Sequence, residues 1–355
     1  MLLDNQIDIS KELMDFIKES PTAFHVVKNF STMLEKAGFI KLNERNKWKI
    51  EQGGKYYVTR NDSSIIAFQV PDNMDFYNFQ IAAAHSDSPA FKIKENPEMV
   101  EDNNYVTLNV EKYGGMLMAP WFDRPLSVAG RVIVREDSGL KPVLVNVDRD
   151  LCVIPNLAIH MNRDVNNGIK YNPQKDMIPL FGEITSKDKF EKIIAMEAGT
   201  DADSIVSADL FLYNREVGKI WGADNEFMSA PRLDDVMCAF SCIKALTDNK
   251  ENSKSVNVCA IFDNEEVGST TKQGADSSFL YDVLSRISMC MGKDSEDFIR
   301  ACASSFMLSA DNAHAVHPNY KEKADPTNRP YMNKGIVIKY NANQKYTTDA
   351  ISASI

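Results

Sequence analysis

The feature that most constrains this chain is an apolar run that stops at two adjacent glutamates. Residues 256–262 (VNVCAIF) are mostly apolar, and 263–268 (DNEEVG) follow directly. Such a run is typical of a buried strand, and the glycine marks a turn. Ligands bind at the carboxyl ends of strands in open α/β sheets, where Glu265 and Glu266 could divide metal binding and proton transfer. Taken alone, an acidic loop after a strand is more often a solvated turn.

Composition limits the classes of protein and of partner. The chain has 355 residues, 44% of them hydrophobic, which is enough for a substantial core and two domains. The balance of 50 acidic to 40 basic residues gives a net charge of -10, which disfavours a nucleic-acid partner. No apolar run approaches membrane-spanning length, and Asp4 and Asp8 lie where a signal peptide would be basic and then apolar. We therefore expect a cytoplasmic protein with no membrane partner.

Cysteine and histidine usage narrows the possible metal sites. The six cysteines form no CxxC pair, so neither a zinc knuckle nor a disulfide framework is indicated. The chain has five histidines, and each can be considered as a ligand. We expect His25, within a helical pattern, to be structural.

The first part of the chain leads to a second polar strand end. Residues 9–37 predict two helices broken at Ser20-Pro21, and 55–70 predict a hairpin. A short apolar strand at 79–84 then ends in His85 and Asp87. The histidine could bind a metal while Asp87 orients an imidazole or a water, although a polar turn before a proline is the simpler alternative.

From about residue 92 to 225 the pattern changes to short β-like runs separated by turns, which predicts an inserted β-rich domain. His160 lies between apolar neighbours there, as structural histidines often do. Asp123 precedes Arg124, and such a pair more often forms a local ion pair than a metal site.

The α/β pattern resumes after the insertion. Residues 229–235 (SAPRLDD) begin a helix that continues to about 246, and Asp234 or Asp235 could be its N-cap. A helix at 277–290 and a strand at 306–310 follow, and the strand ends in Asp311. Separate strand ends and one helix start therefore provide His, Asp and Glu side chains, the ligand types that a pair of divalent ions needs.

These segments together resemble the aspartyl aminopeptidase family of two-metal zinc exopeptidases, in the same order along nearly all of the chain. The segments are 85–89 (HSDSP), 154–163 (IPNLAIHMNR), 232–234 (RLD), 263–269 (DNEEVGS) and 309–320 (SADNAHAVHPNY). The resemblance implies an α/β fold, in which a mixed-sheet zinc-exopeptidase catalytic domain contains an inserted β-rich dimerisation domain. The catalytic domain would comprise residues 1–91 and 226–355, and the insertion residues 92–225.

The resemblance also implies a role for each site residue. His85 and Asp311 would bind one ion, Asp234 would bridge two ions, and Glu266 would bind the second. Glu265 would be the general base and Asp87 a catalytic residue that orients His85. His160 would reach the substrate pocket of a neighbouring subunit. Asp123, His314 and His317 are given no metal role.

The implied activity is removal of N-terminal residues from short peptides by attack of a water activated by two metal ions. The ions would be Zn²⁺, with Co²⁺ or Mn²⁺ as alternatives, and the particle a homo-oligomer, a dodecamer built from dimers. The family has a further histidine ligand downstream, so by resemblance the chain reads as C-terminally truncated at Ile355. A two-metal deacylase or carboxypeptidase and an inactive assembly protein are the alternatives.

Overall fold

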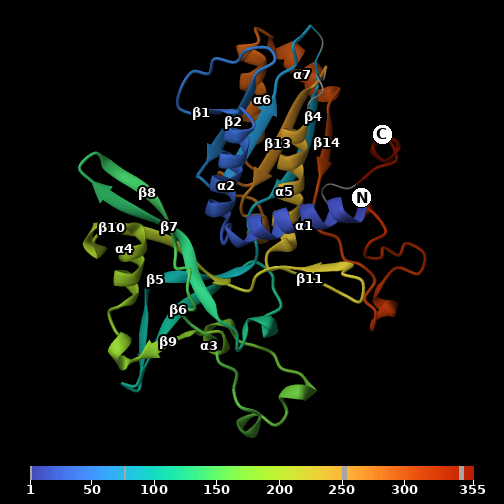
Figure 1. Cartoon of the computed structure of the whole chain (residues 1–355). Helices are drawn as coiled ribbons and strands as arrows, with labels where there is room; N and C mark the ends of the chain where they lie inside the picture. The colour runs from blue at the N-terminus through green and yellow to red at the C-terminus, as the bar shows by residue number, and fades with distance from the viewer. Residues whose placement is uncertain (1, 76, 250–253, 344–347) are drawn as a thin grey trace.

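The computed structural model describes residues 2–75, 77–249, 254–343 and 348–355. Two six-stranded sheets lie one above the other and dominate the structure (Figure 1). The upper sheet is built from both ends of the sequence, and the lower sheet from its middle. This arrangement is a mixed α/β fold, as predicted.

The upper sheet has the strand order β1-β2-β3-β13-β4-β14. Its strands are β1 (Ile40–Leu42), β2 (Lys55–Arg60), β3 (Ser64–Gln69), β4 (Phe79–His85), β13 (Val256–Phe262) and β14 (Phe306–Ser309). Strand β4 is parallel to both β13 and β14, whereas β3 is antiparallel to β13, so the sheet is mixed. The predicted hairpin corresponds to β2 and β3.

The register of the parallel strands decides where the functional groups gather. Phe262 of β13 lies opposite His85 of β4, and Ser309 of β14 lies opposite Ala83. Because parallel strands end at the same edge, the residues after each strand meet there. The apolar sequence of β13 is explained by burial on both faces of the sheet.

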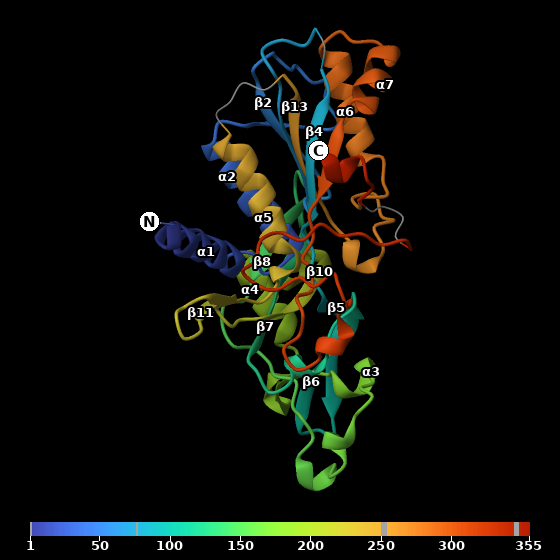
Figure 2. The same ribbon diagram turned by 90° about the vertical axis from the view of Figure 1, so that its right-hand side faces the viewer.

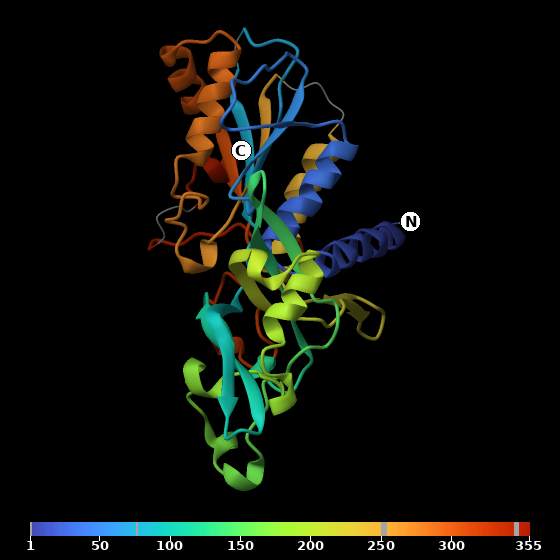
Figure 3. The same ribbon diagram turned by 90° about the vertical axis from the view of Figure 1, so that its left-hand side faces the viewer.

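Helices cover both faces of this sheet (Figures 2 and 3). On one side lie α1 (Leu2–Lys18), α2 (Ala23–Lys36) and α5 (Leu233–Asp248), and on the other α6 (Phe279–Cys290) and α7 (Ser295–Ala303). Each layer has its own buried apolar cluster, one including Phe30 and Ile243 and the other Phe279 and Ile287. The helices predicted at 9–37 and 277–290 are confirmed. The helix predicted from 229 begins at Leu233, after β12 (Phe227–Ser229), and its N-cap is Arg232 rather than Asp234 or Asp235.

The lower sheet is antiparallel, with the order β8-β7-β10-β5-β6-β9. Its strands are β5 (Ala90–Glu101), β6 (Tyr105–Tyr113), β7 (Leu126–Glu136), β8 (Gly139–Asn146), β9 (Leu180–Glu183) and β10 (Ile205–Asn214). Helix α4 (Phe190–Ala198) packs on it, and a short α3 (Pro173–Asp176) lies beside it. The hairpin of β11 (Lys219–Trp221) and β12 (Phe227–Ser229) then leads back to α5.

Residues 155–172 form a loop with two short 3₁₀ helices, η2 (Ile159–Met161) and η3 (Val165–Asn167). In all three ribbon views it lies at the end of the molecule opposite α6 and α7. Among the described residues, no helix combines the length and apolar character needed to cross a membrane.

Candidate metal centre

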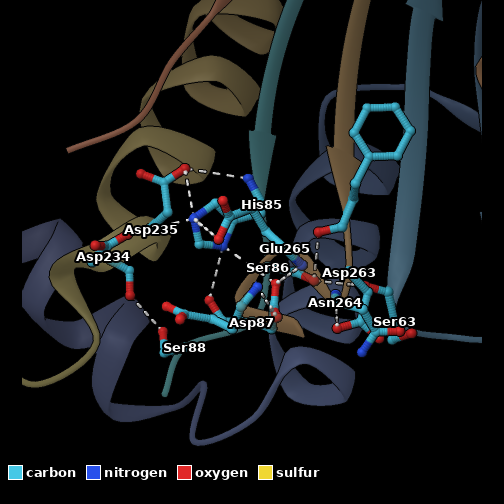
Figure 4. Close-up of polar contacts among 12 residues, drawn as sticks. Ser63, His85, Ser86, Asp87, Ser88, Asp234, Asp235, Asp263, Asn264 and Glu265 are labelled. Atoms are coloured by element: carbon cyan, nitrogen blue, oxygen red, sulfur yellow. Dashed lines mark hydrogen bonds and ion pairs between the residues drawn. The ribbon is translucent and has the colours of Figure 1, made fainter. Parts of the chain in front are cut away.

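The carboxyl edge of the upper sheet brings together four side chains that can bind a metal ion. His85 ends β4, Asp234 and Asp235 lie at the start of α5, and Asp311 follows β14. One nitrogen or oxygen of each lies within 4.8 Å of the others. Figure 4 shows His85 between Asp234, Asp235 and Asp87. The structure therefore gathers three predicted ligands and adds Asp235.

His85 is surrounded by carboxylates. Its Nε2 lies 3.4 Å from Oδ1 of Asp234 and 3.9 Å from Oδ2 of Asp235, and its Nδ1 lies 3.3 Å from Oδ1 of Asp87. Burial lowers the pKa of His85, but hydrogen bonds to Asp234 and Asp87 outweigh it and raise the pKa to about 11. The surplus of negative charge thus demands a cation at this position, and a bound metal ion would replace the proton.

Asp235 is a site residue that sequence reasoning did not assign. It is completely buried, and its Oδ2 accepts a hydrogen bond of 3.2 Å from the backbone N–H of His85. Its Oδ1 accepts one of 3.4 Å from Asn312. Burial raises the pKa of Asp235 to about 7. Asp235 thereby ties the start of α5 to β4 and to the segment after β14.

Asp87 is the point at which β4 is tied to the loop after β13. Its Oδ1 and Oδ2 accept hydrogen bonds of 3.2 Å each from the backbone N–H groups of Glu265 and Glu266. The hydroxyl of Tyr113 donates a third, of 2.7 Å, to Oδ2. Nδ1 of His85 lies 3.1 Å from the backbone carbonyl oxygen of Asp87 and 3.3 Å from its Oδ1, and the predicted orienting role of the Asp87 side chain stays a prediction.

Glu265 and Glu266 form the first turn of η6 (Glu265–Val267) and differ in their surroundings. Oε2 of Glu265 lies 3.9 Å from Nε2 of His85, and the side chain is 47% exposed, so water can reach it. Glu266 is more buried and packs against Gly114. Burial and the charge of Asp87 raise the pKa of Glu266 to about 7, and burial also raises that of Glu265. Glu266, the predicted ligand of a second ion, is not one of the four clustered side chains.

A lysine lies beside Asp311, one of the four clustered side chains. Nζ of Lys339 is 3.4 Å from Oδ2 of Asp311, and both side chains are about half exposed. The sequence reasoning did not assign this contact, which comes from an irregular segment far downstream of the ligand.

The remaining candidates lie elsewhere. His160 is exposed in η2, at the end of the molecule away from the metal centre. Asp123 accepts hydrogen bonds from the backbone and side chain of Asn156, so the expected ion pair with Arg124 is wrong; Arg124 pairs with Glu216 instead.

Two further histidines, His25 and His317, make only local hydrogen bonds among the described residues. His25 shares a hydrogen bond of 2.9 Å with Thr22, and burial followed by the charge of Arg232 lowers its pKa to about 4. His317 accepts a hydrogen bond of 3.1 Å from the backbone of Asn319, consistent with a structural role.

The donor set fits a zinc ion. Zinc binds imidazole nitrogen and carboxylate oxygen, and the four clustered side chains offer both types. Asp234 and Asp311 are exposed, whereas His85 and Asp235 are buried, and a carboxylate buried among other acids is unfavourable unless a cation is bound beside it.

The chain belongs to the aminopeptidase I zinc metalloprotease (M18) family, whose sequence profile matches residues 16–355. The probable M18 family aminopeptidase 2 of Clostridium acetobutylicum is 52% identical over 362 residues, covering 99% of this chain and 83% of that protein. The cryo-EM structure of the Ape4 and Nbr1 complex matches with a TM-score of 0.92 at 38% identity, covering 97% of this chain and 71% of that one. The structure of the S. cerevisiae mApe1 dodecamer matches with a TM-score of 0.85 at 29% identity, covering 99% of this chain and 82% of that one.

These matches confirm the resemblance to the aspartyl aminopeptidase family and the predicted fold class. The family consists of zinc metalloproteases, so the chain is a hydrolase of the aminopeptidase type.

Proposed function

We propose that this protein is a metalloaminopeptidase in which Glu265 is the general base. The observation that supports the proposal is the position of Glu265, exposed and 3.9 Å from a histidine that is itself grouped with three aspartates. A carboxylate that is near a metal site and accessible to water has the geometry that a base needs.

Two metal ions would occupy the site. His85 and Asp311 would hold one, Asp234 would bridge to the second, and Glu266 would bind the second, with Asp87 orienting His85. Zinc is the ion we propose, since the family is a zinc metalloprotease family, and Co²⁺ or Mn²⁺ can use the same ligand types. The number of ions rests on the resemblance and on the position of Glu266 beside Glu265.

When bound, the ions would lower the pKa of a water molecule and polarise the peptide carbonyl. Glu265 would take the proton from the attacking water and return one to the leaving amine. Burial raises the pKa of Glu265, which favours the protonated form that Glu265 would hold between the two proton transfers. Asp87 keeps both glutamates in place through their backbone N–H groups.

The substrates would be short peptides and the active particle a homo-oligomer. The S. cerevisiae mApe1 structure is a dodecamer, and residues 92–225 would mediate the equivalent dimer contacts here. Leu157, Ile159 and Met161 are 55, 46 and 71% exposed beside His160. Apolar side chains exposed together on a projecting loop are typical of a contact surface. On this proposal His160 would complete the substrate pocket of a neighbouring subunit.

The test is Glu265→Gln in the zinc-loaded protein, with a dipeptide and its N-acetylated form as substrates. We expect turnover of the free dipeptide to fall about 10²–10⁴-fold, the range for a general base, with zinc content unchanged. The wild type should leave the acetylated peptide intact. Retention of more than a tenth of the activity would reject Glu265 as the base, and cleavage of the acetylated peptide would favour a deacylase.

A further inference from the structure

We propose that the Tyr113-Gly114 corner of the lower sheet positions the catalytic loop, so that residues 92–225 contribute to the metal site of their own subunit. Only the measurement of kcat and KM described below rests on the proposed function, because the zinc measurements do not need peptide hydrolysis. It assigns Tyr113 as a positioning residue that acts through Asp87, and Gly114 as the surface against which Glu266 is held.

The Tyr113 hydroxyl joins two parts of the catalytic edge. It donates a hydrogen bond of 2.7 Å to Oδ2 of Asp87 and accepts one of 2.8 Å from Nδ2 of Asn264. Oδ1 of Asn264 accepts bonds from Thr271 and Gln273, each of 2.8 Å. A single hydroxyl therefore links the residue after β4 to the loop after β13.

The carboxylate of Asp87, which accepts the hydrogen bond from Tyr113, also accepts hydrogen bonds from the backbone of the loop after β13. Oδ2 accepts from both Tyr113 and the N–H of Glu266, while Oδ1 accepts from the N–H of Glu265. Removing the tyrosine hydroxyl leaves the orientation of the carboxylate less constrained. The histidine ligand beside Asp87 and both glutamates depend on that orientation.

Gly114 makes the second contact. A Cβ added at Gly114 would lie 2.8 Å from both Cβ and Oε2 of Glu266, closer than real Cβ contacts. Its φ of +78° also lies in the region that favours glycine. The backbone of the corner thus approaches Glu266 as closely as a residue without a side chain allows.

The corner is fixed by the lower sheet. Tyr113 pairs with Ala90 of β5, and its ring packs edge-on against Phe211 of β10 at 5.5 Å between centroids. The position of the hydroxyl is therefore set by strands of the insertion, and any shift of that sheet would be transmitted to Asp87.

The first experiment compares Tyr113→Phe with Tyr77→Phe in the full-length chain. Tyr77 is buried, whereas Tyr113 is half-buried, and the hydroxyl of Tyr77 shares one hydrogen bond with Ser288, away from the metal centre. We expect Tyr113→Phe to weaken zinc binding about 10–100-fold, as loss of a partner behind a metal ligand does, measured by competition with a chelating dye. The control should bind zinc normally. Equal zinc affinities in the two variants would overturn the proposal.

Kinetics and a double mutant show whether Tyr113 acts through Asp87. Tyr113→Phe should lower kcat while KM changes less than about twofold, because positioning of the base and ligands is altered rather than substrate contact. In an Asp87→Asn background, Tyr113→Phe should produce little further loss of zinc affinity, since the two changes share one pathway. If the losses of zinc affinity from the two substitutions were additive, Tyr113 would not act through Asp87.

Gly114→Ala and Gly115→Ala provide an independent pair. In the described part of the chain, apart from its two sequence neighbours, no atom lies within 4 Å of a Cβ added at Gly115, so this variant controls for an extra methyl group in the same corner. Gly114→Ala should lower zinc affinity at least tenfold relative to Gly115→Ala, with stability compared by urea midpoint. Equal zinc affinities would contradict the Gly114 contact.

If the wild type binds zinc but hydrolyses no peptide, the proposed function fails while the zinc measurements still decide this inference.

Discussion

The upper and lower sheets use charged residues in opposite ways. In the lower sheet, Asp209 is 3.0 Å from both Lys92 and Arg131, and Arg215 pairs with Asp148 and Asp150. At the carboxyl edge of the upper sheet, acids gather around one histidine. The protein neutralises the first arrangement, whereas in the second three aspartates outnumber the neighbouring cations His85 and Lys339.

The pKa shifts separate the two arrangements. Burial raises the pKa of Asp209, but Lys92 and Arg131 more than offset it, so the net shift is downward. Burial raises the pKa of Asp235 and Asp263 to about 7, and no neighbouring cation reverses it. A buried acid with a raised pKa beside other acids is thus a better sign of a metal site than a buried acid alone.

The largest effect is expected for Asp234→Asn, which removes one negative charge from the cluster around His85. Zinc affinity should fall by at least about 100-fold, since loss of a direct ligand costs more than the 10–100-fold loss of an outer partner. Zinc content after dialysis and turnover of a dipeptide would be measured beside Asp209→Asn as the control. Normal zinc content in Asp234→Asn would show that this aspartate is not a ligand.

Zinc bound at the carboxyl edge of the upper sheet should stabilise the folded protein. At a free concentration of 100 times Kd, a single bound ion adds about 2.7 kcal/mol to the free energy of unfolding. The wild type and Asp209→Asn should both gain this increment over their chelator-treated forms, and Asp234→Asn should not. Equal gains in all three proteins would place the zinc outside the predicted cluster.

Asp209→Asn should lower stability without affecting catalysis. It leaves Lys92 and Arg131 without their carboxylate, and Asp209 is 33% exposed, so the cost should be about 1–2 kcal/mol, below the 3–5 of a fully buried pair. The urea midpoint would measure the loss, and kcat of the folded zinc-loaded protein should stay within twofold. A large fall in kcat with an unchanged midpoint would contradict a structural role.

Local pattern predicted most of the strands and helices around the candidate metal centre, whereas the role of each site residue came from the family resemblance. The strand ends at His85 and Asp311 and the acidic turn at Glu265 follow from apolar runs that stop at polar residues, and the parallel register brings them together. Helix α7 was missed although its signal is present. Asp294 and Asp297 form a capping box, a pattern readable from the sequence.

The remaining features of the site depend on tertiary contacts between residues far apart in the sequence, which no local pattern encodes. Asp234 and Asp235 are adjacent in sequence, and the bend of the backbone at the start of α5 decides that both face His85. Tyr113 reaches Asp87 because the two sheets pack together, and Lys339 approaches Asp311 from an irregular segment. Contacts of this kind follow from packing, which periodicity does not describe.

A pH dependence of stability is expected at Asp263, the acid directly after β13. Burial and the charge of Asp87 raise its pKa to about 7, above about 3.9 for an unfolded aspartate. Between about pH 4 and 7 the folded state therefore binds more protons than the unfolded state, so the free energy of unfolding falls as pH rises through this window. Asp263→Asn does not titrate, so relative to the wild type it should gain up to about 4 kcal/mol between these limits, from about three pKa units at ~1.4 kcal/mol each. Urea midpoints of the chelator-treated proteins at both pH values would measure it, and parallel pH profiles would show that Asp263 ionises normally.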